Sequence, residues 1–137
     1  MPQAFAGFIC GFALSIVYAP FGAWILVTAA GHSAAARRVA PEQTNFFALV
    51  MVLHFIVALA LTAIGMLLGL ALIGLDDGAT QALGTPNIAF TILVLALTPA
   101  LFVPLALLRP VRRYIVPAAV LFAATFGWIM PWLAEAG

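Results

Sequence analysis

One ionisable side chain, that of His54, lies inside a long apolar stretch, residues 46–73. An ionisable group inside a membrane-spanning helix is costly to bury and usually has a function. Three kinds of chemistry suit an imidazole in this position: relaying protons, ligating a haem iron and hydrogen-bonding a quinone. The structural alternative is a neutral histidine that bonds to a hydroxyl or a free carbonyl across a helix interface.

The small residues that follow His54 predict the direction of its side chain. His54 shares a helical face with four residues at later steps of three or four: Ala58, Thr62, Gly65 and Gly69. This predicts an imidazole turned toward protein rather than lipid, roughly 12 Å from the inner membrane boundary. The other histidine, His32, lies in a polar connection. A haem held by two histidines of this chain is therefore not expected, whereas a haem or quinone shared with a partner chain stays open.

Hydroxyl groups are the other polar side chains within the apolar stretches. Thr62 accompanies His54, and Thr91 and Thr98 are seven residues apart in a later stretch, where they share a face. Pro99 and Pro104 free backbone carbonyls in the same stretch. We expect Thr91 and Thr98 to line the path if the chain is a channel or transporter.

The sequence contains no catalytic motif of the common classes. It has no Ser/His/Asp set, HExxH, P-loop or GxGxxG. Cys10 is the only cysteine, which excludes an intramolecular disulfide and a CxxC pair, and Asp76 with Asp77 offers too few oxygen ligands for a metal cage. No acidic residue lies within an apolar stretch, so a self-sufficient proton- or sodium-coupled pump is not expected. We predict no catalytic residue, no metal and no cofactor bound by this chain alone, which disfavours an enzyme.

Four helices must position these groups. Of the 137 residues, 66% are hydrophobic and 7% are charged, against roughly 25% charged in soluble domains. The apolar residues form four blocks long enough to span a bilayer: residues 4–30, 46–73, 87–108 and 114–133. The first block is too long and lacks the basic start of a signal peptide, so we expect it to be a mature helix. The sequence predicts an all-α integral membrane bundle of four transmembrane helices, a single domain over residues 1–137.

The positive charges predict an orientation. All five basic residues lie in the first and third connections: Arg37, Arg38, Arg109, Arg112 and Arg113. Basic residues collect on the cytoplasmic side, so we expect these arginines to contact the inner leaflet and both termini to lie on the outer side. The protein is expected to be a multi-pass protein of a prokaryotic cell membrane. The net charge of +1 gives no reason to expect a nucleic-acid partner.

Small residues predict helix contacts on three of the four segments. The predicted packing positions are Gly7, Gly11, Gly65, Gly69, Ala119, Ala123 and Gly127. These faces favour an accessory or anchoring subunit of a larger membrane complex, whose partners are the lipid bilayer and other subunits or copies of itself. A small oligomeric channel or transporter is the first alternative. A redox or quinone-linked component that uses His54 is the second.

Overall fold

The computed structural model describes residues 2–30, 34, 38, 45–75 and 88–136, and this part of the chain contains helices and turns without strands. The elements are α1 (Pro2–Ala30), α3 (Phe46–Gly74), α4 (Ile88–Leu105), η1 (Arg112–Tyr114), α5 (Ile115–Ala124), η2 (Thr125–Ile129) and α6 (Met130–Ala136). Four stretches are long and apolar enough to cross a membrane: Gln3–Ala29, Phe46–Gly74, Ile88–Leu105 and Arg112–Ala136. The predicted all-α fold with four transmembrane helices is confirmed.

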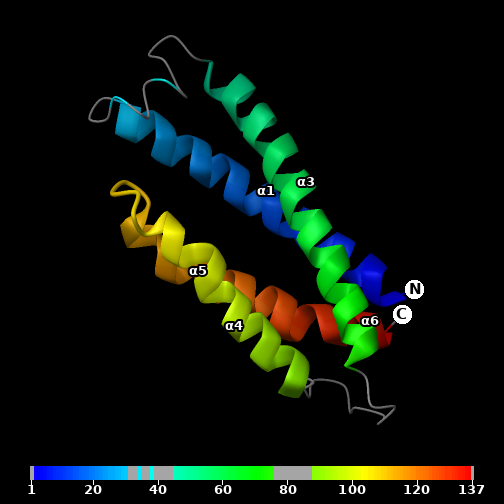
Figure 1. Cartoon of the computed structure of the whole chain (residues 1–137). Coiled ribbons are helices and arrows are strands. Elements are labelled where there is room, and N and C mark those ends of the chain that lie inside the picture. The colour runs from blue at the N-terminus through cyan, green and yellow to red at the C-terminus, as the bar shows by residue number, and fades with distance from the viewer. Residues whose placement is uncertain (1, 31–33, 35–37, 39–44, 76–87, 137) are drawn as a thin grey trace.

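The helices form two hairpins that pack together. α1 lies against α3 along its length, and α4 lies against α5 and η2. α1 also contacts η2 and α6, so it joins the two hairpins (Figure 1). Both termini lie at one end of the bundle, and the turn between α4 and α5 lies at the other end (Figure 1). Four passes are an even number, so both ends of the chain lie at the same end of the bundle.

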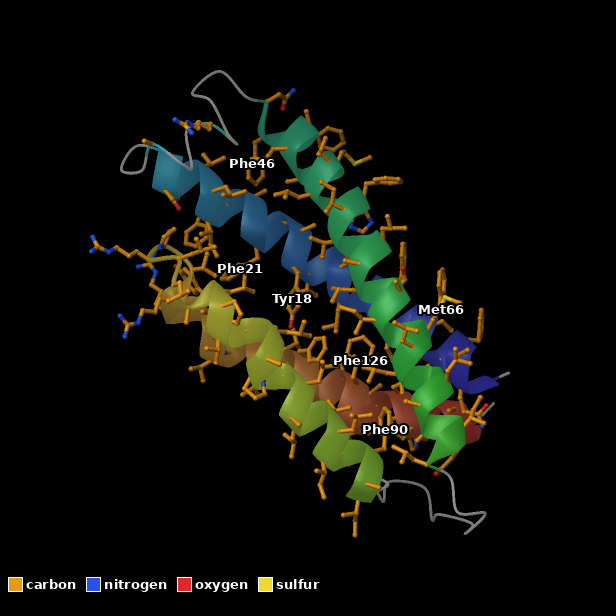
Figure 2. The ribbon with its side chains drawn as sticks, in the orientation of Figure 1. Tyr18, Phe21, Phe46, Met66, Phe90 and Phe126 are labelled. Carbon is orange, nitrogen blue, oxygen red and sulfur yellow. The ribbon has the colours of Figure 1, made fainter. Side chains whose placement is uncertain are left out.

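Aromatic side chains fill the centre of the second hairpin. Phe90, Phe122, Phe126 and Met130 are fully buried. The ring of Phe122 meets that of Phe126 at a centroid distance of 4.8 Å and that of Phe102 at 5.7 Å. Figure 2 shows Phe90 and Phe126 between the ribbons of the bundle. Such tilted and edge-to-face ring pairs pack densely and leave an interior made of hydrocarbon.

The outer surface of the bundle is also apolar. Large side chains point away from the protein on every long helix, and two of them are the 72% exposed Phe55 of α3 and the 77% exposed Ile88 of α4. A surface of this kind is unfavourable in water and matches the hydrocarbon of a bilayer. The exposed face therefore fits a multi-pass membrane protein.

The third helix is shorter than the predicted 87–108. α4 ends at Leu105, and the backbone then forms tighter i→i+3 bonds, from Leu107 N to Pro104 O at 3.2 Å and from Leu108 N to Leu105 O at 3.0 Å. Residue 87 lies outside the described part of the chain. These i→i+3 bonds turn the chain toward the fourth helix within a few residues. Residues 106–108 are apolar, so composition alone placed the end of the helix too late.

The fourth helix is longer and less regular than the predicted 114–133. It runs from Arg112 to Ala136 and contains the π-helix η2. Pro131 has no backbone N–H to donate to the carbonyl one α-turn earlier, so the regular pattern is interrupted there. The wider turn is closed from Met130 N to Thr125 O. Three consecutive residues in this turn, 125–127, are buried.

Candidate functional site

His54 lies at the edge of the interface between α1 and α3. Its ring meets the ring of Phe12 on α1 edge-to-face, with 5.7 Å between the centroids and 75° between the planes. The side chain of His54 is half-buried, and that of Phe12 is exposed. One side of the imidazole therefore rests on protein, and the other side opens onto the lateral surface of the bundle.

This position differs from the predicted interior placement. Thr62, Gly65 and Gly69 are buried on the α3 face that the sequence indicated, but Ala58 and His54 are only half-buried. The burial of the face therefore decreases toward the start of α3. At His54 the neighbouring group is the aromatic ring of Phe12, which lies beside the imidazole rather than over it.

Among the described residues, the imidazole has neither of the two partners within the chain, a hydroxyl or a free carbonyl, that the structural alternative requires. The Thr62 hydroxyl donates to the carbonyls of Ala58 at 2.6 Å and Leu59 at 3.2 Å, both within its own helix. In the described ranges, the imidazole pairs with the ring of Phe12, and no hydroxyl or carbonyl hydrogen-bonds it. Its nitrogens are therefore available to a group outside these residues.

The two threonines of α4 lie on the side that packs against the fourth helix. Thr98 is buried, and its hydroxyl donates to the carbonyl of Val94 at 2.7 Å. The Oγ1 atom of Thr91 is buried without a hydrogen-bond partner. Val94, which lies between them, is fully buried. This face is otherwise apolar. It carries the hydroxyl of Thr98, which is hydrogen-bonded within its own helix, and the hydroxyl of Thr91, which has no hydrogen-bond partner.

The small residues of the first two helices lie directly against each other. A Cβ atom added to Gly7 would collide with the backbone carbonyl of Gly65, and one added to Gly11 would lie 2.8 Å from the Thr62 Cα. Gly69 approaches the backbone of residues 3 and 4 in the same way. The absence of side chains at these positions lets the two backbones meet.

The small residues of the fourth helix are packed less tightly. Gly127 is buried, and a Cβ atom added there would lie 3.7 Å from a methyl carbon of Val94, an ordinary contact distance. Ala119 and Ala123 are half-buried. The fourth helix therefore approaches α4 through side chains rather than backbone to backbone.

Four arginines of the described residues are exposed: Arg38, and Arg109, Arg112 and Arg113 at or near the turn between α4 and α5. Arg37 lies outside the described residues. The guanidinium of Arg113 lies over the ring of Tyr114, 4.6 Å from its centroid. This geometry is a cation–π contact, and it orients the side chain of Arg113.

Tyr18 makes a polar contact between helices, and it was not among the site residues predicted from the sequence. Its hydroxyl donates to the carbonyl of Ala118 at 2.6 Å, which links α1 to α5. Figure 2 shows Tyr18 between the two hairpins. The signal was present in the sequence, because a tyrosine in the middle of an apolar helix usually finds a hydrogen-bond partner when it is buried.

Neither a protein-family model, nor a curated protein, nor a solved structure matches this chain. Within the described residues, no three His, Cys, Asp or Glu side chains come together in a group that could hold a metal ion. The function is therefore argued from the residues of the bundle themselves.

Proposed function

We propose that this chain is a non-catalytic subunit of a larger membrane assembly, and that a neighbouring subunit packs against the His54 side of α1 and α3. The observation that carries this proposal is the half-exposed imidazole within a 29-residue apolar helix, without a hydrogen-bond partner among the described residues. A polar group that faces hydrocarbon alone is costly. A polar group on a neighbouring transmembrane helix would remove that cost.

The surroundings of His54 suit a helix of another subunit. Phe12, Met51 and Phe55 are exposed near it on α1 and α3, so the imidazole is one polar group within an apolar surface. In membranes, helices associate through close packing together with a few hydrogen bonds. The expected partner is therefore an apolar transmembrane helix that presents a hydroxyl, amide or carbonyl group at the depth of His54.

Photo-crosslinking in the native membrane tests this proposal. We would replace Met51, which is 54% exposed one turn before His54, with a photoreactive phenylalanine analogue. The matched control carries the same analogue at Val103 of α4, which is 62% exposed on the other hairpin. We expect a discrete adduct with a second polypeptide from position 51, none from position 103, and loss of the position-51 adduct in His54→Leu.

Three results would refute the proposal. One is an absence of adducts at position 51, and another is the same adduct from both positions. The third is an adduct of the chain with itself, together with a stable symmetric oligomer of the purified protein. That last result would replace the accessory subunit with a self-assembling protein.

A redox or quinone-linked role is the second candidate, and it uses the same residue. The open side of the imidazole could donate to a quinone carbonyl, and the ring of Phe12 would flank the bound head group. An absorption spectrum of natively purified protein without haem bands would exclude a shared haem. Quinone content unchanged between the wild type and His54→Leu would exclude the quinone.

The channel alternative receives less support from the geometry. The Thr98 hydroxyl bonds within its own helix, and buried Phe122 and Phe126 fill the second hairpin beside α4. A conducting path would need polar groups that turn toward a common line. The buried Oγ1 of Thr91 is the one feature here that favours such a path.

A further inference from the structure

The turn between α4 and α5 concentrates positive charge. Arg109, Arg112 and Arg113 lie within five residues, and all three are exposed. In the described part of the chain the acidic residue is Glu135, near the other end of the fourth helix. Glu135 is 22 residues from Arg113, which corresponds to about 33 Å along a helix. The charge of the turn is therefore not neutralised by the described residues.

The backbone of this turn is held by hydrogen bonds. Val111 N donates to the carbonyl of Leu108 at 3.0 Å, Arg112 N donates to the same carbonyl at 3.2 Å, and Tyr114 N donates to Val111 O at 2.8 Å. These bonds bring the three arginines onto one compact turn. The backbone positions of the three arginines are therefore fixed before a ligand binds, and the ordering cost of binding is limited to their side chains.

Aromatic rings lie directly beside the arginines. The ring of Tyr114 meets that of Phe21 at 4.9 Å and that of Trp24 at 5.9 Å, both on α1. Phe21 and Trp24 are also partly exposed at the side of the bundle. Figure 2 shows Phe21 facing the second hairpin near this end. Aromatic rings in such positions mark the level of lipid head groups.

We propose that these residues bind one anionic phospholipid from the adjoining leaflet. The site, here termed the arginine–aromatic cluster, consists of Phe21, Trp24, Arg109, Arg112, Arg113 and Tyr114. The guanidinium groups bind the phosphate and the anionic head group, because a planar fork of N–H donors matches phosphate oxygens. The exposed edges of Phe21 and Trp24 pack against the acyl chains. Charge above apolar rings at the membrane surface fits a phospholipid better than a soluble anion.

Quenching of Trp24 fluorescence by brominated lipid measures this binding. The protein carries Trp128→Phe and Trp132→Phe, so that Trp24 is its single tryptophan. It is reconstituted into phosphatidylcholine vesicles that contain a small fraction of lipid brominated on the acyl chains. We expect brominated phosphatidylglycerol to quench Trp24 more strongly than brominated phosphatidylcholine at the same fraction. The preference should fall roughly fivefold for each arginine of the cluster that is removed.

Substitutions separate a built site from general surface charge. Arg112→Gln with Arg113→Gln should abolish the preference, and Arg113→Lys should reduce it, because lysine keeps the charge but loses the planar fork. Arg38→Gln removes an exposed arginine outside the cluster and should leave the preference unchanged. Equal quenching by the two lipids, or an equal effect of Arg38→Gln, would overturn the proposal. Loss of the preference on adding millimolar inorganic phosphate would overturn it in favour of a soluble anion.

Discussion

At the scale of single residues, the hydroxyl of Tyr18 is the best-defined bond between the two hairpins. It reaches the carbonyl of Ala118 at 2.6 Å from a helix on the other side of the interface. Because few polar groups compete for partners in hydrocarbon, this bond should contribute to the association of α1 with α5. Measured hydrogen bonds between transmembrane helices are modest, however, and contribute about 1 kcal/mol.

We therefore expect Tyr18→Phe to lower the free energy of unfolding in detergent micelles by about 1 kcal/mol. Tyr114→Phe is the matched control, because its ring contacts with Phe21 and Trp24 remain after the hydroxyl is removed. Unfolding of both variants by titration with a denaturing detergent gives the comparison. Equal stabilities of the two variants would show that the Tyr18 bond does not hold the hairpins together.

The candidate residues were only partly predictable from the sequence. His54 was identifiable because it is the one ionisable group in its apolar run. Helical periodicity also placed it on the face of Thr62 and Gly65, which are buried. Periodicity gives the direction of a side chain but not the distance to the neighbouring helix. For that reason the half-exposure of His54 and its contact with Phe12 required the structure.

At the scale of elements, the pairing of α1 with α3 depends on glycines that face each other. There is no room for a Cβ atom at Gly7 or Gly65, because the nearest atoms belong to the backbone of the opposing helix. A backbone cannot move aside as a flexible side chain can, so an added methyl group must push the two helices apart. The contact along the whole hairpin would then weaken.

Gly7→Ala should accordingly destabilise the protein by about 1–3 kcal/mol, the usual cost of overpacking. Gly22→Ala, on the same helix, adds the same methyl group where nothing lies within 4 Å. It should be neutral or stabilising by up to about 1 kcal/mol, since alanine favours helix over glycine. The same unfolding titration measures both. If Gly7→Ala is as stable as Gly22→Ala, the close approach of α1 and α3 is wrong.

The existence of the four helices could be predicted from the sequence, and their irregularities could not. Apolar runs of about 20 residues or more identify a span regardless of its neighbours. The π-helix η2 precedes Pro131, and Phe126 within it and Met130 after it are fully buried, a tertiary environment that local sequence does not reveal. The end of α4 at Leu105 likewise depends on turn bonds, which apolar composition does not reveal.

At the scale of the whole molecule, the bundle has two chemically different ends. One end carries the exposed arginines of the turn between α4 and α5, and the other carries both termini (Figure 1). Between them, the outward surface is apolar on all sides. An apolar surface has the same composition whether lipid or another subunit covers it, so the sequence does not distinguish the two. For this reason the sequence predicted the fold class but not the function.

The orientation of the bundle in the membrane decides which leaflet the arginine–aromatic cluster meets and which side of the membrane lies nearer to His54. We expect the arginine end to face the cytoplasm and both termini to face outward. Cysteine labelling in intact cells tests this most directly, in a Cys10→Ala background that removes the single native thiol. The two labelled variants are Glu135→Cys, near the C-terminus, and Leu107→Cys, in the turn after α4.

A membrane-impermeant maleimide should label Glu135→Cys in intact cells and Leu107→Cys only after the cells are opened. The Cys10→Ala protein without a new cysteine should remain unlabelled in both conditions. Labelling of Leu107→Cys in intact cells, with Glu135→Cys protected, would contradict the predicted orientation. Labelling of both variants in intact cells would contradict a fourth helix that crosses the membrane.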